Sequence, residues 1–353
     1  MNVCPFARPG GGRIKRSGDP PEVKPGCFDR GENLKILFIT STRVGDAILS
    51  TGLLAHLIER HPDARVTIAC GPAAAPLFDA VPNLDRIIVL DKMVGSLHWL
   101  MLWSACVRHV WDVLVDLRSS PMFFILAARQ RWRIGRGRAN LHRVSQLAEV
   151  LNLQDNPPAP HLWITDAHRK EARRLIPDGP PVLAVGPTAN WGAKMWPAER
   201  FAQLIERLTD ADGILPGARV AIFGRDDERP LALNLIEAIP EARRIDLAGH
   251  LDLLEVFACL QRCAFYVGND SGLMHLTAAS NIPTLGLFGP SREEHYAPWG
   301  PRCGLVRTTV PFSEIFPPEF DHRSTDSLMD SLSVDAAEAA AHDLWEKTRG
   351  MAS

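Results

Sequence analysis

Short apolar runs rich in β-forming residues alternate with stretches of helical periodicity along most of this 353-residue chain. In the first half, strands are predicted at 34–40, 65–69, 86–90 and 112–117, and residues 47–59 carry apolar side chains at helical spacing. Strands that alternate with helices predict a parallel sheet with helices on both faces, because helical crossovers return the chain to the same sheet edge. The predicted fold class is therefore α/β.

The same rhythm begins again after proline-rich segments at 157–160 and 177–181. Further strands are predicted at 182–185, 218–223, 244–247, 264–267 and 284–288. We therefore expect two α/β halves with a cleft between them. The predicted organisation is a disordered leader at 1–33, a first domain at 34–176, a second at 177–320, and a closing helix and tail at 321–353. Ser333 is the expected N-cap of a helix over 334–348.

Composition excludes several classes of function. The net charge of −2 gives no reason to expect nucleic acid. The most apolar segment, 97–107, has only about half the length that a membrane-spanning helix needs, and the leader lacks the apolar centre of a secretory signal. The seven cysteines form no C-x-x-C pair, and Cys259 and Cys263 are expected to be buried free thiols rather than metal ligands or a disulfide. This usage suits a reducing cytosol.

The most specific stretch is 266–275, where an apolar run ends in an Asn-Asp-Ser-Gly turn and a helix-like segment follows. Free N–H groups at a helix N-terminus, placed at the carboxyl edge of a sheet, bind phosphate. Ser271 and Gly272 can direct their N–H groups at a phosphate, whereas Asp270 would repel it and is expected to cap the helix or bind a sugar hydroxyl. His275 either faces a diphosphate or is a buried core histidine.

A second candidate site is the loop after the strand at 182–185, where small and hydroxylic residues precede a lysine. Thr188 can donate a hydrogen bond to a diphosphate, and Lys194 supplies a point charge. The alternative is a solvated lysine beside a core Trp196, with Pro197 starting a helix.

A third candidate follows the strand at 218–223. Asp226 could hold ribose hydroxyls, as acids do in nucleotide-binding folds. With Glu228 it could also be mistaken for a metal-binding pair, or both acids could simply favour a helix N-terminus.

The loop after the first strand, 40–46, places Gly45 in a tight turn and Asp46 at the start of a helix. Asp46 is either a functional acid or a first-turn acid favoured by the helix dipole. No G-x-G-x-x-G follows this strand, which argues against a nicotinamide dehydrogenase.

Two features of the first half concern larger partners. A basic run is either a solvated face or a surface for an anionic acceptor or membrane; it comprises Arg129, Arg131, Arg133, Arg136, Arg138, His142 and Arg143. The segment 97–103, with Trp99 and Trp103 on one face, could touch lipid headgroups, but a core helix is the favoured interpretation.

Three blocks in the right order give the chain a resemblance to family 9 glycosyltransferases, the bacterial lipopolysaccharide heptosyltransferases. They are residues 39–57 with Val44-Gly-Asp46, residues 186–204 with Lys194 and Trp196-Pro197, and residues 266–290 with Asp270-Ser-Gly-Leu-Met-His275 and Leu287-Phe-Gly-Pro290. The resemblance implies the glycosyltransferase B fold, with two Rossmann-like domains, the donor on the second and the acceptor on the first.

The resemblance also implies roles for individual residues. Asp46 falls on the catalytic base. The donor-binding set is Thr188, Lys194, Asp226, Asp270, Ser271, Gly272 and His275, with the backbone near Gly249–Leu251 beside adenine. Candidate acceptor contacts are Arg43, Asp116, Arg118 and Arg136. The family threonine of the phosphate-binding turn is Ser271 here, and Pro187 replaces a second phosphate-binding hydroxyl.

The implied activity is inverting transfer of a heptose from an ADP-sugar to a lipopolysaccharide core or related lipid-linked glycan, with no cofactor and no metal. The implied location is cytoplasmic, peripheral at the inner face of the inner membrane. Two alternatives stay open. One is a transferase or epimerase for a different nucleotide sugar on the same fold. The other is a non-catalytic sugar-nucleotide-binding protein.

Overall fold

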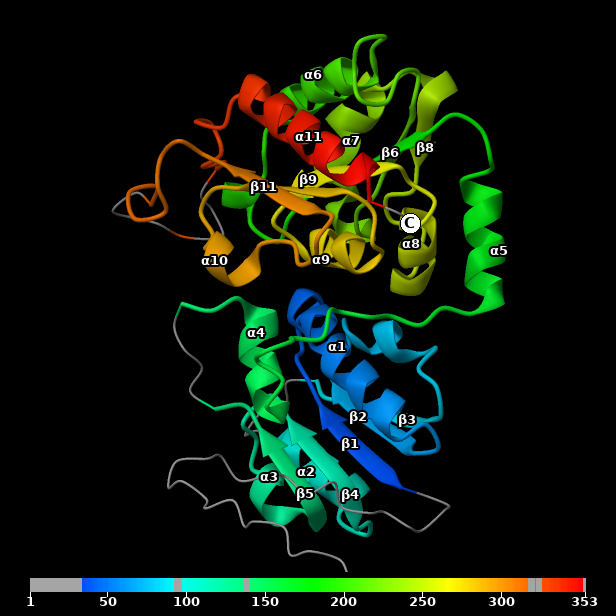
Figure 1. The fold of residues 1–353 in the computed structure, drawn as a ribbon, viewed down its shortest axis with the longest axis vertical. Helices are drawn as coiled ribbons and strands as arrows, with labels where there is room; N and C mark the ends of the chain where they lie inside the picture. The colour runs from blue at the N-terminus through cyan, green and yellow to red at the C-terminus, as the bar shows by residue number, and fades with distance from the viewer. Residues whose placement is uncertain (1–33, 92–96, 136–139, 317–320, 322–325, 352–353) are drawn as a thin grey trace, which may run out of the picture. The chain divides into compact units, whose positions relative to one another are not determined.

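A computed structural model of the protein describes residues 34–91, 97–135, 140–316, 321 and 326–351. Within them the chain forms two parallel sheets flanked by helices (Figure 1). The first sheet has the strand order β3-β2-β1-β4-β5. Its strands are β1 (Lys35–Ile39), β2 (Arg65–Cys70), β3 (Leu84–Val89), β4 (Trp111–Asp116) and β5 (Ala128–Arg133).

The second sheet has the order β11-β10-β9-β6-β7-β8. Its strands are β6 (Val182–Gly186), β7 (Arg219–Ile222), β8 (Arg244–Asp246), β9 (Phe265–Asn269), β10 (Thr284–Phe288) and β11 (Cys303–Arg307). Every residue of β4, β6, β9 and β10 is buried. Continuous apolar runs are typical of parallel strands covered on both faces, so the α/β prediction is confirmed.

Eleven helices are described. They are α1 (Val44–Arg60), α2 (Leu97–Cys106), α3 (Met122–Ile125), α4 (Arg143–Ala148), α5 (Asp166–Leu175), α6 (Ala198–Thr209), α7 (Arg229–Ala238), α8 (Leu253–Leu260), α9 (Gly272–Ala279), α10 (Glu293–Tyr296) and α11 (Val334–Arg349). Short 3₁₀ turns are η1 (Ala75–Phe78), η3 (Glu149–Leu151), η4 (Gly192–Lys194), η5 (Asp226–Glu228) and η6 (Glu241–Arg243).

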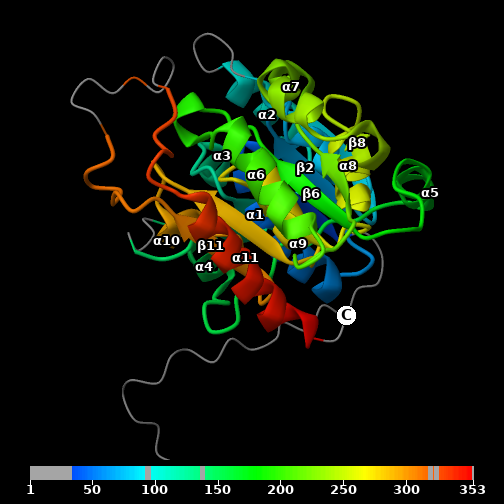
Figure 2. The ribbon, with the colours of Figure 1, turned by 90° about the horizontal axis from the view of Figure 1, so that it is seen from above.

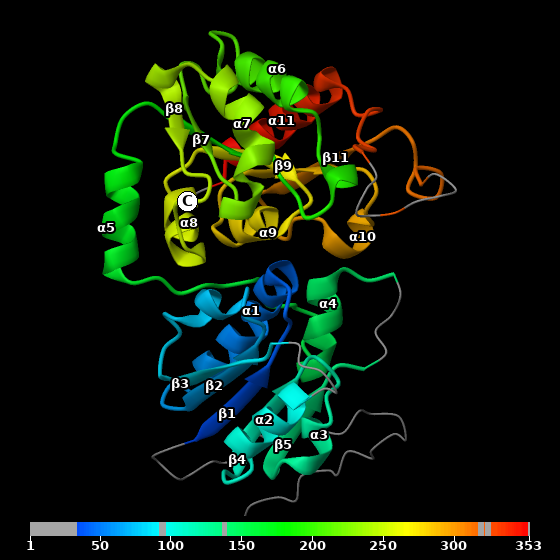
Figure 3. The same cartoon turned by 180° about the vertical axis from the view of Figure 1, so that it is seen from behind.

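The last helix returns to the second sheet. The hydroxyl of Ser333 accepts a hydrogen bond from the Ala336 N–H at 3.1 Å, which confirms the predicted N-cap. α11 lies beside α6 (Figure 2), and Arg207 of α6 pairs with Asp335 and Glu338 of α11. A second contact between helices distant in sequence is that of α5 with α8, which pack along each other (Figure 3).

Strand order decides where a ligand can bind. The chain moves to opposite sides of β1 in the first sheet and of β6 in the second. In open parallel sheets the ligand crevice lies at the carboxyl ends of the two strands that flank this switch point. The relevant loops are therefore those after β1 and β4, and those after β6 and β9.

The basic run contains a strand that the sequence analysis missed. β5 is an edge strand in which Arg129, Arg131 and Arg133 are exposed and alternate with partly buried residues. Charged side chains on an edge strand oppose edge-to-edge aggregation. These three arginines therefore form an exposed basic face in strand form, and both interpretations of the basic run stay open.

The interpretation of 97–103 as a core helix was wrong for one face of α2. His98, Leu102 and Cys106 are buried, but Leu97, Leu100 and Met101 are 51%, 59% and 42% exposed. On the predicted shared face, Trp99 is partly buried and Trp103 is 36% exposed. Within the described residues, no helix has the length and apolar character needed to cross a bilayer.

The backbone of the proline-rich segment at 157–160 packs closely against α1 at Gly52. A Cβ atom added at Gly52 would lie 2.4 Å from the Pro158 carbonyl oxygen and 2.5 Å from that of Ala159. Gly52→Ala should therefore lower the free energy of unfolding by ~1–3 kcal/mol, the usual cost of overpacking. Denaturant unfolding would measure this, with Gly350→Ala as control because nothing lies within 4 Å of that position. Equal stability of the two variants would contradict the close approach.

Candidate functional site

The loops after β6 and β9 meet at the switch point of the second sheet. Strands β6 and β9 are paired, with Gly186 opposite Gly268 near their carboxyl ends. The Lys194 ammonium then reaches the Asp270 carboxylate, with 2.6 Å between Nζ and Oδ2. Both side chains are largely buried, at 16% and 6% exposure. Residues 76 positions apart thus form one charged pair where the fold predicts a ligand.

Asn269 holds this loop in place, and the sequence analysis did not single it out. Its side-chain oxygen accepts a hydrogen bond from the Trp196 N–H at 3.1 Å, and its amide donates to the Pro187 carbonyl at 2.7 Å. Asn269 is fully buried. A polar residue at the last position of an otherwise apolar strand was the available signal, because a buried amide needs partners. Trp196 is buried too, as the core alternative predicted.

The turn after β9 presents the N-terminus of α9. Ser271 occupies the N-cap position without a side-chain capping bond, and Gly272 begins the helix. Of the two roles expected for Asp270, the helix cap is wrong, because its carboxylate is paired with Lys194 instead, and the contact with a sugar hydroxyl stays a prediction. The N–H groups at 271–272 therefore remain available at the positive end of the helix dipole.

His275 lies in the first turn of α9 and is 4% exposed. Burial lowers the pKa of His275 to about 4, so the imidazole is neutral at pH 7. Its Nδ1 is buried without a hydrogen-bond partner. His275 is buried, as the core interpretation predicted. Its ring nevertheless lies close to the turn of Asp46, because a Cβ atom added at Gly45 would lie 3.2 Å from the ring.

Thr188 and the acids after β7 form a second group beside the first. The Thr188 hydroxyl donates to the Glu228 carboxylate at 2.9 Å. Glu228 is thus a partner of the loop after β6, a role that spacing did not suggest. Gly249 has a φ of +80°, and a Cβ atom there would lie 2.9 Å from the Asp226 Cα. Only glycine allows this approach, which brings the predicted ribose and adenine segments together.

Asp46 lies in the first turn of α1, which begins two residues earlier than predicted, at Val44. Its carboxylate is 3.8 Å from the Arg143 Nε and is 20% exposed. The N-termini of α1 and α9 touch, since a Cβ atom at Gly272 would lie 3.4 Å from Val44 and 3.5 Å from the Gly45 nitrogen. The turn that carries Asp46 therefore lies against the turn that carries Ser271 and Gly272.

The candidate acceptor residues have different surroundings. Asp116 is fully buried, and its carboxylate accepts hydrogen bonds from the Arg118 N–H and from the Ser120 N–H and hydroxyl. Burial raises the pKa of Asp116 despite these bonds. This carboxylate holds its own loop, whereas Arg43 is exposed at the N-cap of α1. Arg136 lies outside the described residues.

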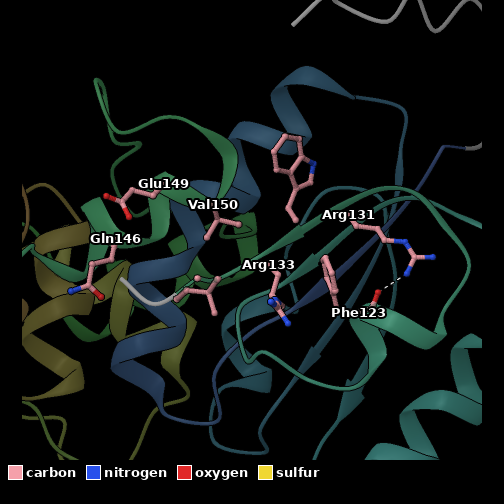
Figure 4. A pocket seen from close by; sticks show the side chains of 9 residues that line it. Phe123, Arg131, Arg133, Gln146, Glu149 and Val150 are labelled. Atoms are coloured by element: carbon pink, nitrogen blue, oxygen red, sulfur yellow. Dashed lines mark hydrogen bonds between the residues drawn. The ribbon is translucent and has the colours of Figure 1, made fainter. Parts of the chain in front are cut away.

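A pocket of about 440 Å³ lies beside the end of β5 (Figure 4). Its walls include Phe123, Arg131, Arg133, Gln146, Glu149 and Val150. The pocket is linked to Asp46 through α4, because the Arg143 guanidinium donates to the Gln146 side chain at 3.2 Å. An anionic group could be held here by the two strand arginines.

Metal-binding groups of three or more His, Cys, Asp or Glu side chains do not occur in the described part of the chain. Cys259 and Cys263 are free and buried, as predicted. Burial raises the pKa of the Cys259 thiol to about 12.

Comparison with known proteins gives three findings. The model of glycosyltransferase family 9 (heptosyltransferase) matches residues 83–315. Lipooligosaccharide heptosyltransferase 2 of Haemophilus influenzae is 26% identical over 311 residues, which cover 78% of this chain and 88% of that protein. Two solved structures share the fold. One is a family 9 glycosyl transferase from Veillonella parvula (19% identity, TM-score 0.70, covering 89% of this chain and 98% of that one). The other is ADP-heptose lps heptosyltransferase II of E. coli (20%, TM-score 0.68, covering 90% and 100%).

Proposed function

Because the chain belongs to glycosyltransferase family 9, we propose that it moves a heptose from an ADP-activated donor to a lipopolysaccharide core or related glycan. The fold is glycosyltransferase B. The observation that carries the proposal is the contact between the first turns of α1 and α9. It sets an acid, Asp46, beside N–H groups and a lysine suited to a diphosphate.

The donor would bind at the switch point of the second sheet. Its diphosphate would face the N–H groups of Ser271 and Gly272 and the ammonium of Lys194, which together with the α9 dipole favour negative charge. Asp226 beside Gly249 would hold the ribose. Thr188 donates its only hydroxyl proton to Glu228, so it would have to turn from Glu228 to donate to a donor phosphate.

The transfer step needs a base for the acceptor hydroxyl, which is Asp46, and positive charge for the leaving diphosphate, which Lys194 and the α9 N-terminus supply. The acceptor hydroxyl passes its proton to an Asp46 carboxylate oxygen while its own oxygen attacks the anomeric carbon. The bond from that carbon to the diphosphate oxygen breaks, and its electrons stay on the nucleoside diphosphate. Attack from the face opposite the leaving group inverts the anomeric configuration. Lys194 and the α9 N-terminus stabilise the charge that develops.

The acceptor would occupy the first half, next to the pocket walled by Arg131 and Arg133. Arg143 connects this region with Asp46, since it lies 3.8 Å from that carboxylate and bonds Gln146 of the pocket wall. Guanidinium groups favour phosphate or carboxylate ligands. An acceptor that carries such groups near the reacting hydroxyl would be oriented by these side chains. Lipid linkage of the acceptor would place the enzyme at the cytoplasmic face of the inner membrane.

We expect the transfer to survive metal removal. Lys194 and the helix N-terminus provide positive charge where the diphosphate leaves. Initial rates should be equal in EDTA and in Mg²⁺, Mn²⁺ or Fe²⁺. Loss of activity in EDTA with recovery on adding one cation would instead make the acids at 226–228 candidate metal ligands.

Calorimetric binding of ADP, UDP, GDP and CDP in EDTA tests the donor assignment. We expect ADP to bind most tightly, and ADP-heptose to be consumed only when a lipopolysaccharide core acceptor is present. Tighter binding of UDP or GDP than of ADP would exclude an ADP-heptose donor but would still fit a glycosyltransferase. Donor conversion without acceptor would indicate an epimerase, and donor binding without turnover on any acceptor would indicate a binding protein.

A further inference from the structure

One side of the first sheet carries an exposed apolar surface that the transfer reaction does not use. We define this apolar surface as the outward side chains of α2 and α3: Leu97, Leu100, Met101, Trp103, Phe124 and Ile125, which are 51%, 59%, 42%, 36%, 67% and 52% exposed. Single exposed apolar residues are ordinary, but a group of this kind marks an interaction site.

The two helices face the same side. Leu102 and Cys106 of α2 and Met122 of α3 belong to one buried cluster, which packs on Leu37 and Leu114 of the sheet. α2 and α3 also contact each other. Because their buried faces cover one cluster, their exposed faces both point away from it. The apolar surface is therefore shared by both helices.

Arginines surround this surface. The Arg118 guanidinium lies 4.9 Å from the Trp99 ring, and that of Arg133 lies 5.0 Å and 5.2 Å from the rings of Phe123 and Phe124. Arg108 is exposed just after α2. Cations held against aromatic rings at the rim of an apolar patch suit the boundary between water and lipid.

The segment that carries both helices, residues 97–135, exposes charge of one sign. Residues 97–135 contain five arginines and two acids. Both acids are buried: Asp112 pairs with Arg129, and Asp116 holds its own loop. The charge that residues 97–135 expose to solvent is therefore positive. A protein partner with an apolar face would not need this, whereas anionic headgroups attract each nearby Lys or Arg.

We propose that α2 and α3 dock the protein on an anionic phospholipid bilayer, with the apolar surface in the headgroup layer and the arginines on lipid phosphates. Phe123 lines the pocket beside β5 while its neighbour Phe124 belongs to the apolar surface. Docking would thus bring the proposed acceptor pocket next to the membrane. The docking surface itself is independent of which sugar is transferred.

Vesicle flotation of the full chain tests the proposal with neither donor nor acceptor present. Wild type should float with phosphatidylglycerol/phosphatidylcholine vesicles and at least about tenfold less with pure phosphatidylcholine. Leu100→Ser with Ile125→Ser should weaken the partition coefficient at least about tenfold, because each change removes apolar carbons from the lipid phase. Raising salt from about 0.1 to about 0.5 M should weaken the binding of wild type to the anionic vesicles, because salt screens the arginines.

The matched control is Leu231→Ser with Leu233→Ser on α7, which are also exposed, at 53% and 40%. That variant should float like wild type. All variants should keep wild-type ADP binding, which separates docking from folding and from the donor site. Absence of wild-type binding to anionic vesicles, or equal binding of both double variants, would overturn the proposal. Concentration-dependent dimers lost only in the α2–α3 variant, without flotation of wild type, would assign the surface to a second copy of the chain instead.

Discussion

Asp46→Asn should lower the turnover number by ~10²- to 10⁴-fold, the usual contribution of a general base, and leave ADP affinity unchanged. Asparagine keeps the size of the side chain but cannot accept the acceptor proton. Asp46 is on α1, opposite the donor loops, so the nucleotide contacts stay intact. Steady-state kinetics with saturating donor and acceptor would give the change in turnover, and calorimetry the affinity.

A suitable control is Glu59→Gln, which removes a carboxylate from the exposed last turn of the same helix. It should turn over like wild type. Asp46→Asn could also act through Arg143, which loses its ion-pair partner. Arg143→Gln separates the two effects, because it should raise the acceptor KM more than it lowers turnover. Near-wild-type turnover in Asp46→Asn would remove Asp46 from the role of base.

Lys194→Ala should weaken ADP binding by about 10- to 100-fold, since a hydrogen bond to a charged group contributes ~1.5–3 kcal/mol. The side chain is preplaced at the carboxyl edge of the second sheet and is only 16% exposed. The change also leaves the buried Asp270 carboxylate without its partner, and an unpaired charge there would repel a diphosphate. Calorimetric titration of ADP would measure the loss.

Removing one partner of a buried ion pair also destabilises the fold. Lys194→Ala should therefore lower the denaturation midpoint, and adding Asp270→Asn should restore stability but not ADP affinity. Lys170→Ala, on the exposed face of α5, is the control for removing a lysine charge. Wild-type ADP affinity in Lys194→Ala would show that this lysine serves only the ion pair.

The sequence by itself determined the succession of strands and helices. Nine of the eleven described strands were predicted, because buried parallel strands are nearly continuous apolar runs, as in β6 and β9. Two edge strands, β5 and β11, were missed. β5 alternates arginine with other residues, and no residue of β11 is fully buried, so neither has the continuous buried run. One face of α2 was misjudged for a different reason. A helix without charged residues predicts burial on all sides, yet only one side of α2 packs on the sheet.

The candidate residues were also predictable, because turns after apolar strands bear the ligand contacts in parallel sheets. Their partners were not. Only the strand order β9-β6-β7 brings Asp270 to Lys194 and Thr188 to Glu228. The role of Asn269 likewise depends on two loops that are distant in sequence. Local sequence patterns determine which residues end a strand. The pairing of strands across each sheet and the contact of α1 with α9 depend on the tertiary structure, in which helices bury both faces of each sheet.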